Sequence, residues 1–251
     1  IQWPAGRPAK VSPIYDSLLK AGAVMGSYGG WERADWFTNN ESLKKPANSY
    51  DRQHWFDDVS KECNHVAEHC GVIDLTGFSR FEISGEGTSQ WLETLITGRL
   101  PKIGKVGLVY FSSHKGKVLT EMTATRISED HIWLLTGAGA YWHDRDWLNF
   151  NLPESSNIKI VDTTHDLGTM LLTGPKSDLL IAKLTDEKTD NESFPWLSHK
   201  SIKLCGEDTR VLKVSYAGEK GFEIHVHNDS MRKIYDELVQ HGENFNLIHF
   251  G

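Results

Sequence analysis

The sequence predicts an α+β fold built from two related halves. A strand, a Ser or Thr, a Gly, a turn and a helix follow one another at 81–95, and the same succession recurs at 170–184. A hairpin pattern with a glycine-containing turn follows each of these segments, at 106–126 and at 210–227. One supersecondary unit used twice is the most economical account of this order.

An aromatic arm is expected at residues 1–60. Large rings stand there among Gly, Pro, Asn and Asp, which predicts an irregular segment packed along a neighbouring surface rather than a disordered tail. Ser12 is expected to cap a short helix that has Pro13 in its first turn, and 29–33 is expected to form a loop.

The first half is placed at 61–165 and the second half at 166–251. A helix is predicted at 57–70 with Gly71 as its C-terminal cap. The other predicted elements are a strand at 132–136, a helix at 142–150 and a helix at 231–240. The chain begins at Ile1 and stops soon after a helix-like run, so we expect a fragment or a truncated gene product.

Composition narrows the class of protein. With 251 residues, 39% of them hydrophobic, the chain is long enough to bury one large core or two modest ones. The formal net charge of −7 argues against a nucleic-acid partner. No apolar run approaches the roughly 20 residues that a membrane span needs, so no membrane partner is expected. Three cysteines, expected to be core thiols, indicate a reducing compartment: the cytoplasm, or the mitochondrial matrix in a eukaryote.

The predicted helix at 57–70 contains the pattern HxxEH at 65–69. This is the residue order of inverzincin metalloproteases, but no third ligand suggests itself, and no metal is expected. We interpret the pattern as a polar helix face. The core-facing side is expected to carry Cys63, Val66, Ala67 and Cys70.

The second hairpin is the strongest candidate for a binding site. Its turn is expected to bring Tyr216 close to Glu223 in the returning strand. A carboxylate accepts hydrogen bonds from a ring N–H and an exocyclic amine together, while an aromatic side chain covers the ring face. The pair therefore suits a flat heterocycle such as a pterin. Alternatively, Glu223, His225 and His227 form the solvated face of an antiparallel strand.

The first hairpin carries an acid at a similar distance from its turn. Glu121 follows Gly116 by five residues, as Glu223 follows Gly218. If a pseudo-twofold axis relates the halves, the two acids face one cleft. The spacing is equally compatible with two unrelated surface acids.

Several ordered motifs resemble one family. Residues 71–81 resemble the GVxDLSxFxK segment in the folate-binding half of dimethylglycine and sarcosine dehydrogenases, whose relatives include the aminomethyltransferase, or T-protein, of the glycine cleavage system. Residues 117–126 are similar to the GGxxxDLTVTR strand of this family, and 215–223 to its SYxGExGxE hairpin. Residues 6–37 resemble the segment that joins the flavin half of those dehydrogenases to the folate half.

This resemblance implies ferredoxin-like repeats and a tetrahydrofolate site. Tyr216 and Glu223 match the positions that hold the pterin in the family. Glu121 matches an aspartate beside the reactive folate nitrogens, and Thr123 follows it on the same strand face. The implied activity is that of a one-carbon transferase, which captures a one-carbon unit from an N-methylated amine as 5,10-methylenetetrahydrofolate. A carboxylate there stabilises developing positive charge and moves a proton.

The chain also departs from the family pattern. Glu121 is one methylene longer than the aspartate it replaces, and Gly137 stands where T-proteins usually have Asn. No flavin-binding fingerprint occurs, so FAD is expected only through a missing or partner flavoprotein amine dehydrogenase domain. The family's basic folate-contacting region and closing C-terminal barrel have no counterpart here. A non-catalytic folate-binding module and a docking subunit therefore stay open as alternatives, and so does the amine donor.

Overall fold

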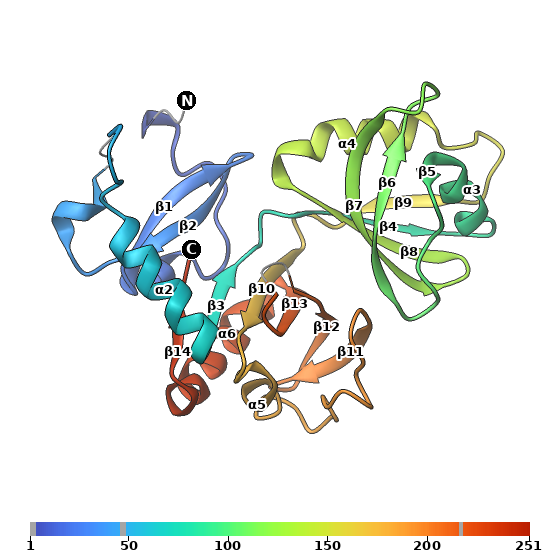
Figure 1. Cartoon of the computed structure of the whole chain (residues 1–251). Coiled ribbons are helices and arrows are strands. Elements are labelled where there is room, and N and C mark those ends of the chain that lie inside the picture. The colour runs from blue at the N-terminus through green and yellow to red at the C-terminus, as the bar shows by residue number, and fades with distance from the viewer. Residues whose placement is uncertain (1–3, 46–48, 216–217) are drawn as a thin grey trace.

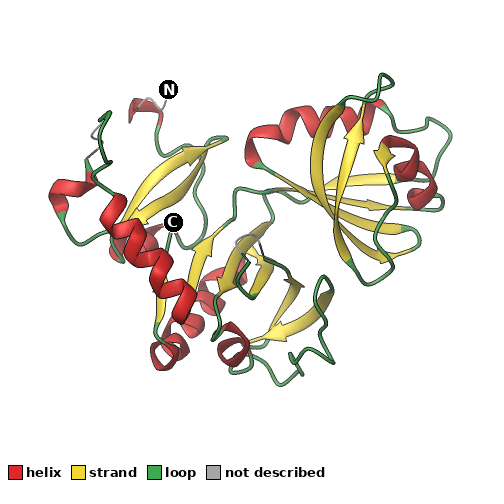
Figure 2. Ribbon diagram, viewed as in Figure 1, coloured by secondary structure: helices red, strands yellow, loops and turns green. Residues whose placement is uncertain are grey.

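The computed structural model describes residues 4–45, 49–215 and 218–251. Within them, the strands form one two-stranded and two six-stranded sheets. Figure 1 shows these sheets as three lobes, and Figure 2 shows the helices on their flanks. The mixed α and β content confirms the predicted α+β fold.

The boundaries of the elements are as follows. The helices are α1 (Tyr15–Lys20), α2 (Phe56–Glu68), α3 (Thr88–Leu95), α4 (Tyr141–Phe150), α5 (Ser177–Ile181) and α6 (Asn228–Gly242), with 3-10 turns η1 (Pro4–Gly6), η2 (Glu41–Lys44), η3 (Ala138–Ala140) and η4 (Glu243–Phe245). The strands are β1 (Ala23–Tyr28), β2 (Trp31–Phe37), β3 (Cys70–Asp74), β4 (Ser79–Ser84), β5 (Ile96–Thr97), β6 (Val106–Ser112), β7 (Val118–Ser128), β8 (His131–Thr136), β9 (Lys159–Asp162), β10 (Leu167–Thr173), β11 (His199–Leu204), β12 (Glu207–Lys213), β13 (Gly221–His227) and β14 (Leu247–His249).

One six-stranded sheet, here called the β7 sheet, has the order β5-β6-β7-β8-β4-β9. Its neighbouring strands pair antiparallel. One face is apolar: Phe81, Ile83, Met122 and Ala124 belong to a cluster that includes Leu92 of α3 and Leu148 of α4. The alternation of inward and outward residues along β7 explains why only this face is covered by helices.

The other six-stranded sheet, the β13 sheet, has the order β11-β12-β13-β10-β3-β14. Met170, Phe222 and Ile224 point to the face packed by α5 and α6, and apolar residues of the arm join this core. Strand β14 pairs with β3 in parallel. The predicted division at residues 165 and 166 lies between β9 and β10, yet β3, from the proposed first half, pairs with β10. The division into domains stays a prediction.

The two large sheets pack their remaining faces against each other. Trp133 and Leu135 of the β7 sheet form a buried cluster with Leu212 of β12 and Val214 beyond it. Arg210 lies between the sheets, with its guanidinium carbon 4.4 Å from the centre of the Trp133 ring. It also forms a bidentate ion pair with Glu82, with both N–O distances at 3.0 Å. These contacts fix how the β7 sheet lies relative to the β13 sheet.

The arm is more regular than expected. Residues 31–33, predicted to be loop, begin β2, because aromatic residues pair across the hairpin: Tyr28 lies opposite Trp31. The hydroxyl of Ser12 donates to Asp74 and caps no helix, so the first turn of α1 has no side-chain cap. Packing along a neighbouring surface is confirmed, since apolar residues of α1, β1 and β2 are buried in the core of the β13 sheet.

The helix predicted at 57–70 ends at Glu68, because Cys70 and Gly71 belong to β3. Its predicted core face is partly wrong. Val66 and Cys70 are buried, but Cys63 and Ala67 are exposed. Glu62 is buried instead, because its carboxylate accepts hydrogen bonds from the backbone N–H groups of Phe37 (2.7 Å) and Gly251 (3.2 Å).

Candidate functional site

Glu223 lies in the middle of β13, opposite Leu171 of β10 on one side and Leu212 of β12 on the other. The predicted hairpin is confirmed, but strand β12 ends at Lys213, earlier than expected. The alternative interpretation as a solvated face is wrong for Glu223 and His225, whose exposed fractions are 1% and 2%. It is right for the exposed His227. The β7 sheet covers this face and excludes water from it.

A chain of buried polar groups holds one oxygen of Glu223. His225 Nε2 lies 2.6 Å from Glu223 Oε1, and His225 Nδ1 lies 2.8 Å from Thr169 Oγ1. Burial lowers the pKa of His225, although the Glu223 carboxylate opposes this effect. A neutral imidazole carries one N–H, so Nε2 donates to the carboxylate and Nδ1 accepts from the Thr169 hydroxyl. The imidazole edge also packs on Trp133, with 4.5 Å between ring centres.

Arg80 is the last member of this chain of hydrogen-bonded groups. It is fully buried, and its Nη2 donates to Thr169 Oγ1. Its Nη1 donates to the carbonyl oxygen of Phe78 at 2.8 Å and to that of Thr76 at 3.2 Å. Burial lowers the pKa of Arg80 to about 10, while the nearby Glu223 carboxylate raises it. One buried cation therefore connects the turn at residues 76–78 to the carboxylate on β13.

A cavity of about 430 Å³ lies on the same face of the β13 sheet as Glu223; Glu223 itself does not line it, but the residue opposite Glu223 on β10 does. Leu171, the direct neighbour of Glu223, forms its floor with Ile73, and Phe78 lines it from the turn held by Arg80. Cys63 and Ala67, the exposed apolar residues of α2, form the opposite wall. The volume falls in the range of small-molecule sites, and mostly apolar walls suit a flat ring.

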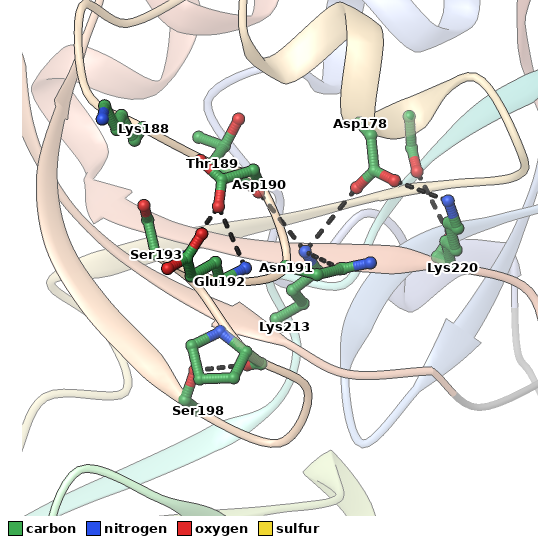
Figure 3. Close-up of polar contacts among 12 residues, drawn as sticks. Asp178, Lys188, Thr189, Asp190, Asn191, Glu192, Ser193, Ser198, Lys213 and Lys220 are labelled. Carbon is green, nitrogen blue, oxygen red and sulfur yellow. Dashed lines mark hydrogen bonds and ion pairs between the residues drawn. The ribbon is translucent and has the colours of Figure 1, made fainter.

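The hairpin that carries Glu223 is held near its turn by α5 (Figure 3). Asp178 lies 2.7 Å from Lys220 Nζ and 3.7 Å from Lys213 Nζ, so it bridges the end of β12 and the residue before β13. The Lys213 side chain is only 4% exposed, and its ammonium also donates to Asn191 Oδ1 at 2.9 Å. Burial lowers the pKa of Lys213. A buried ammonium with several oxygen partners fixes the position of this part of β12.

Glu121 lies on β7, on the face of the β7 sheet that includes Trp133 and Leu135. It is exposed and stands opposite Tyr110, and its carboxylate raises the pKa of the Tyr110 phenol. Thr123, two residues further along this face, is half-buried beside Leu135. Neither Glu121 nor Thr123 lines the 430 Å³ cavity.

The expected correspondence between Glu121 and Glu223 is wrong. Strand β4 of the first repeat pairs with β8, whereas β10 of the second repeat pairs with β13. Glu82 and Leu171 occupy equivalent positions in the repeats at 81–95 and 170–184. Trp133 lies opposite Glu82, and Glu223 lies opposite Leu171, so Trp133 is the structural counterpart of Glu223. The sequence spacing was misleading because β8 lies between β7 and β4, and no corresponding strand separates β13 from β10.

Three other sequence predictions concern residues around the site. Tyr216 lies outside the described residues. Gly137 caps η3, and a methyl group built on it would have no atom within 4 Å. His65 and His69 are neighbours, with 4.7 Å between ring centres, and His65 Nε2 bonds to the carbonyl of Asn246 at 2.6 Å. Among the described residues, no group of three or more His, Cys, Asp or Glu side chains is placed to hold a metal ion.

Sequence reasoning missed His225, Thr169 and Arg80 as members of the site. A signal was present for Thr169, which is a polar residue in the middle of the largely apolar strand β10. A buried polar group needs a partner, so Thr169 indicates a polar neighbour such as His225 on the adjacent strand, whereas Arg80 comes from β4 of the other sheet. Pairing them required the register of β10 with β13, which one sequence does not provide.

The family of the chain follows from comparison with known proteins. A family model described as the GCVT N-terminal domain matches residues 14–251, so the chain belongs to this family. Among solved structures, the glycine cleavage system aminomethyltransferase T from Bartonella henselae has the same fold. Its TM-score is 0.77 at 20% identity, over 96% of this chain and 60% of that chain. The resemblance seen in the sequence is confirmed.

The curated relatives fall into two groups. Mitochondrial dimethylglycine dehydrogenase of Rattus norvegicus is 30% identical over 249 residues, which cover 98% of this chain and 29% of that protein. Aminomethyltransferase of Symbiobacterium thermophilum is 25% identical over 247 residues, 96% of this chain and 61% of that protein. The chain thus spans less than a third of the dehydrogenase. No helix in the described part of the chain is long and apolar enough to cross a membrane.

Proposed function

We propose that this chain is the folate-binding part of a tetrahydrofolate-dependent one-carbon transferase. It takes a one-carbon unit from an N-methylated amine and releases it as 5,10-methylenetetrahydrofolate. The observation that carries the proposal is the buried Glu223 carboxylate, oriented by His225 and paired across the strands with Leu171, which lines an apolar cavity. Membership of a family with aminomethyltransferases and dimethylglycine dehydrogenases supports the same function.

The residues around the cavity fit a pterin. The ring system offers adjacent N–H donors, and Glu223 is held as an acceptor by a neutral His225. Phe78, Leu171 and Ile73 provide the apolar surface for the ring faces. In this proposal Glu223 anchors the pterin, and Tyr216 is the aromatic wall. When bound, tetrahydrofolate supplies the nitrogen nucleophiles that accept the one-carbon unit.

Glu121 and Thr123 are proposed to act at the reacting end of the folate. Glu121, opposite Tyr110 on the neighbouring strand, stabilises positive charge and moves a proton. Thr123 offers a hydroxyl on the same strand face, closer to the contact between the sheets. This assignment places the chemistry on β7 and the binding on β13.

The amine is oxidised elsewhere in this proposal. We propose a flavoprotein amine dehydrogenase domain or subunit, carrying FAD, as the partner that supplies the one-carbon unit. The similarity to sarcosine oxidase subunit alpha of Corynebacterium sp., 26% identical over 97% of this chain, supports such a partner. The compartment that fits is the cytoplasm, or the mitochondrial matrix in a eukaryote; the rat relative is named as a mitochondrial protein.

A non-catalytic folate-binding module is the second candidate. It is favoured by the position of Glu121, which is exposed and does not line the 430 Å³ cavity. Such a module would bind folate through Glu223 and leave the rate of one-carbon capture unchanged.

Calorimetric titration with tetrahydrofolate tests the binding site. We expect micromolar affinity, weakened at least about tenfold by Glu223→Gln, because an anchoring hydrogen bond to a carboxylate is lost. Glu207→Gln is the matched control, since Glu207 is an acid on the neighbouring strand that pairs with Lys233 away from the cavity. Equal affinity in the three proteins, or no binding to the unmodified chain, would contradict the proposal.

The rate of 5,10-methylenetetrahydrofolate formation from formaldehyde separates the two candidates. A transferase accelerates this reaction above the uncatalysed rate, and Glu121→Gln reduces the acceleration by about a hundredfold or more. Tight folate binding without acceleration would instead identify the non-catalytic module.

A further inference from the structure

A second cavity, of about 310 Å³, lies where the arm meets the β7 sheet. Three segments enclose it: the β1–β2 hairpin, the turn at 75–78 and the glycine-rich loop at 137–139. Figure 1 shows the hairpin tip approaching the start of α4. The approach is close, because a methyl group built on Gly29 would lie 2.6 Å from the carbonyl oxygen of Ala138. Leu75 and Phe78 line both this cavity and the 430 Å³ cavity.

The two carboxylates that line this cavity already have partners. Glu32 accepts from Arg7 at 2.8 Å through Nε and at 2.6 Å through Nη2. Asp74 accepts from the Ser12 hydroxyl and from the backbone N–H of Thr76 at 2.9 Å. Neither acid is therefore available to balance a further cation at the cavity.

The third charged residue in the lining is Arg33. It forms no ion pair with any described residue, and its Nε is buried without a hydrogen-bond partner among them. Its guanidinium carbon lies 3.9 Å from the centre of the Tyr28 ring, which orients the planar group. Tyr28 is held in turn by a 2.7 Å hydrogen bond from its hydroxyl to Asp35. A fixed guanidinium without an acidic partner is a receptor for a carboxylate.

The rest of the lining suits an apolar body attached to that carboxylate. Trp31, which is buried, and Phe78 both line the cavity, so aromatic surface is available. Gly137 and Gly139 leave open space, since a methyl group built on either would meet no atom within 4 Å. The volume is that of a small-molecule site at the low end of the usual range.

We propose that Arg33 and this cavity bind the carboxylate of a small organic anion with a flat or apolar body. Two sources offer this chemistry: the glutamyl end of a folate and the carboxylate of an N-methylated amino acid. For the folate source the inference rests on the proposed function; for the amino-acid source it stands without it.

The test uses three probes and the full chain. Isothermal titration is carried out with para-aminobenzoylglutamate, with N,N-dimethylglycine and with the uncharged para-aminobenzamide. We expect at least one of the two carboxylate probes to bind the unmodified chain, and Arg33→Gln to weaken that binding at least about tenfold. Binding of the amide should be weaker and insensitive to Arg33→Gln. Binding of the aryl glutamate alone identifies a folate end, and binding of dimethylglycine identifies an amine substrate.

Arg52→Gln is the matched control, because Arg52 also stacks at 3.9 Å on an aromatic ring, that of Phe56, but lines no part of this cavity. Its affinities should stay within about twofold of the unmodified chain. Gly137→Val fills the cavity from the opposite wall and should weaken binding as Arg33→Gln does. The inference is overturned if neither carboxylate binds, or if Arg33→Gln and Arg52→Gln behave alike. Parallel titration of Glu223→Gln with tetrahydrofolate reports separately on the proposed function.

Discussion

Replacing Thr169 by Val breaks the buried network at its centre. Both side chains are β-branched and similar in shape, so the change removes mainly a hydroxyl. The Thr169 hydroxyl accepts from Arg80 and bonds to His225 Nδ1, so these two buried partners each lose one hydrogen bond. A hydrogen bond from a charged donor contributes roughly 1.5–3 kcal/mol and a neutral one about 1 kcal/mol. We therefore expect the free energy of unfolding to fall by about 3 kcal/mol.

Urea denaturation followed by tryptophan fluorescence measures this change, and Thr209→Val is the control. Thr209 is also buried in a strand of the β13 sheet, but its hydroxyl makes one neutral hydrogen bond, to the carbonyl of Ile202 at 2.7 Å. Its replacement should cost about 1 kcal/mol. A loss for Thr169→Val no larger than that for Thr209→Val would refute the claim that Arg80 and His225 depend on this hydroxyl.

Three further predictions concern pH, the arm and the hairpin. Burial lowers the pKa of His225 and His249, so as pH falls the unfolded chain binds protons at these side chains before the folded chain does. The free energy of unfolding is therefore full above about pH 6.5 and decreases below it, and denaturation across pH 5–8 should show a smaller slope for His249→Gln. Gly29→Ala should lower the free energy of unfolding by about 1–3 kcal/mol more than Gly30→Ala, because both have positive φ but only Gly29 contacts Ala138. Asp178→Asn removes the charge between Lys213 and Lys220 and should cost about 1–3 kcal/mol, whereas Asp208→Asn, in an exposed pair with Lys203, should cost less than about 0.5 kcal/mol by the same denaturation.

The sequence was sufficient for the type of most elements outside the arm but not for their partners. Hairpins, helices and the repeated turn at 81–95 and 170–184 were found because periodicity and glycine positions are local signals. The pairing of β8 with β4 was not found from the sequence. Because of this pairing, Trp133 and not Glu121 is the counterpart of Glu223. Which strands become neighbours depends on the packing of whole sheets, and the alternation of polar and apolar residues leaves that order open.

The candidate site was also predicted only in part. Glu223 could be identified from its hairpin, but its burial could not, because the β7 sheet that packs over it comes from another part of the chain. The prediction for Ser12 failed for the same reason. Its residue type predicted a helix cap, but its hydroxyl donates a hydrogen bond to Asp74, which is far away in the sequence. A short polar side chain has several possible partners, and the one it takes is decided by tertiary contacts.

The route of the chain through the sheets has a consequence for folding. Strand β3 belongs to the β13 sheet, yet every strand of the β7 sheet lies between β3 and β10 in sequence. The β7 sheet is thus a nested insertion, assembled from contacts within one continuous stretch. The β13 sheet must close around it, and β14 reaches β3 across most of the chain. Because distant pairings form slowly, the inserted lobe should acquire its structure first, and the carboxylate of β13 becomes enclosed only in the last step of folding.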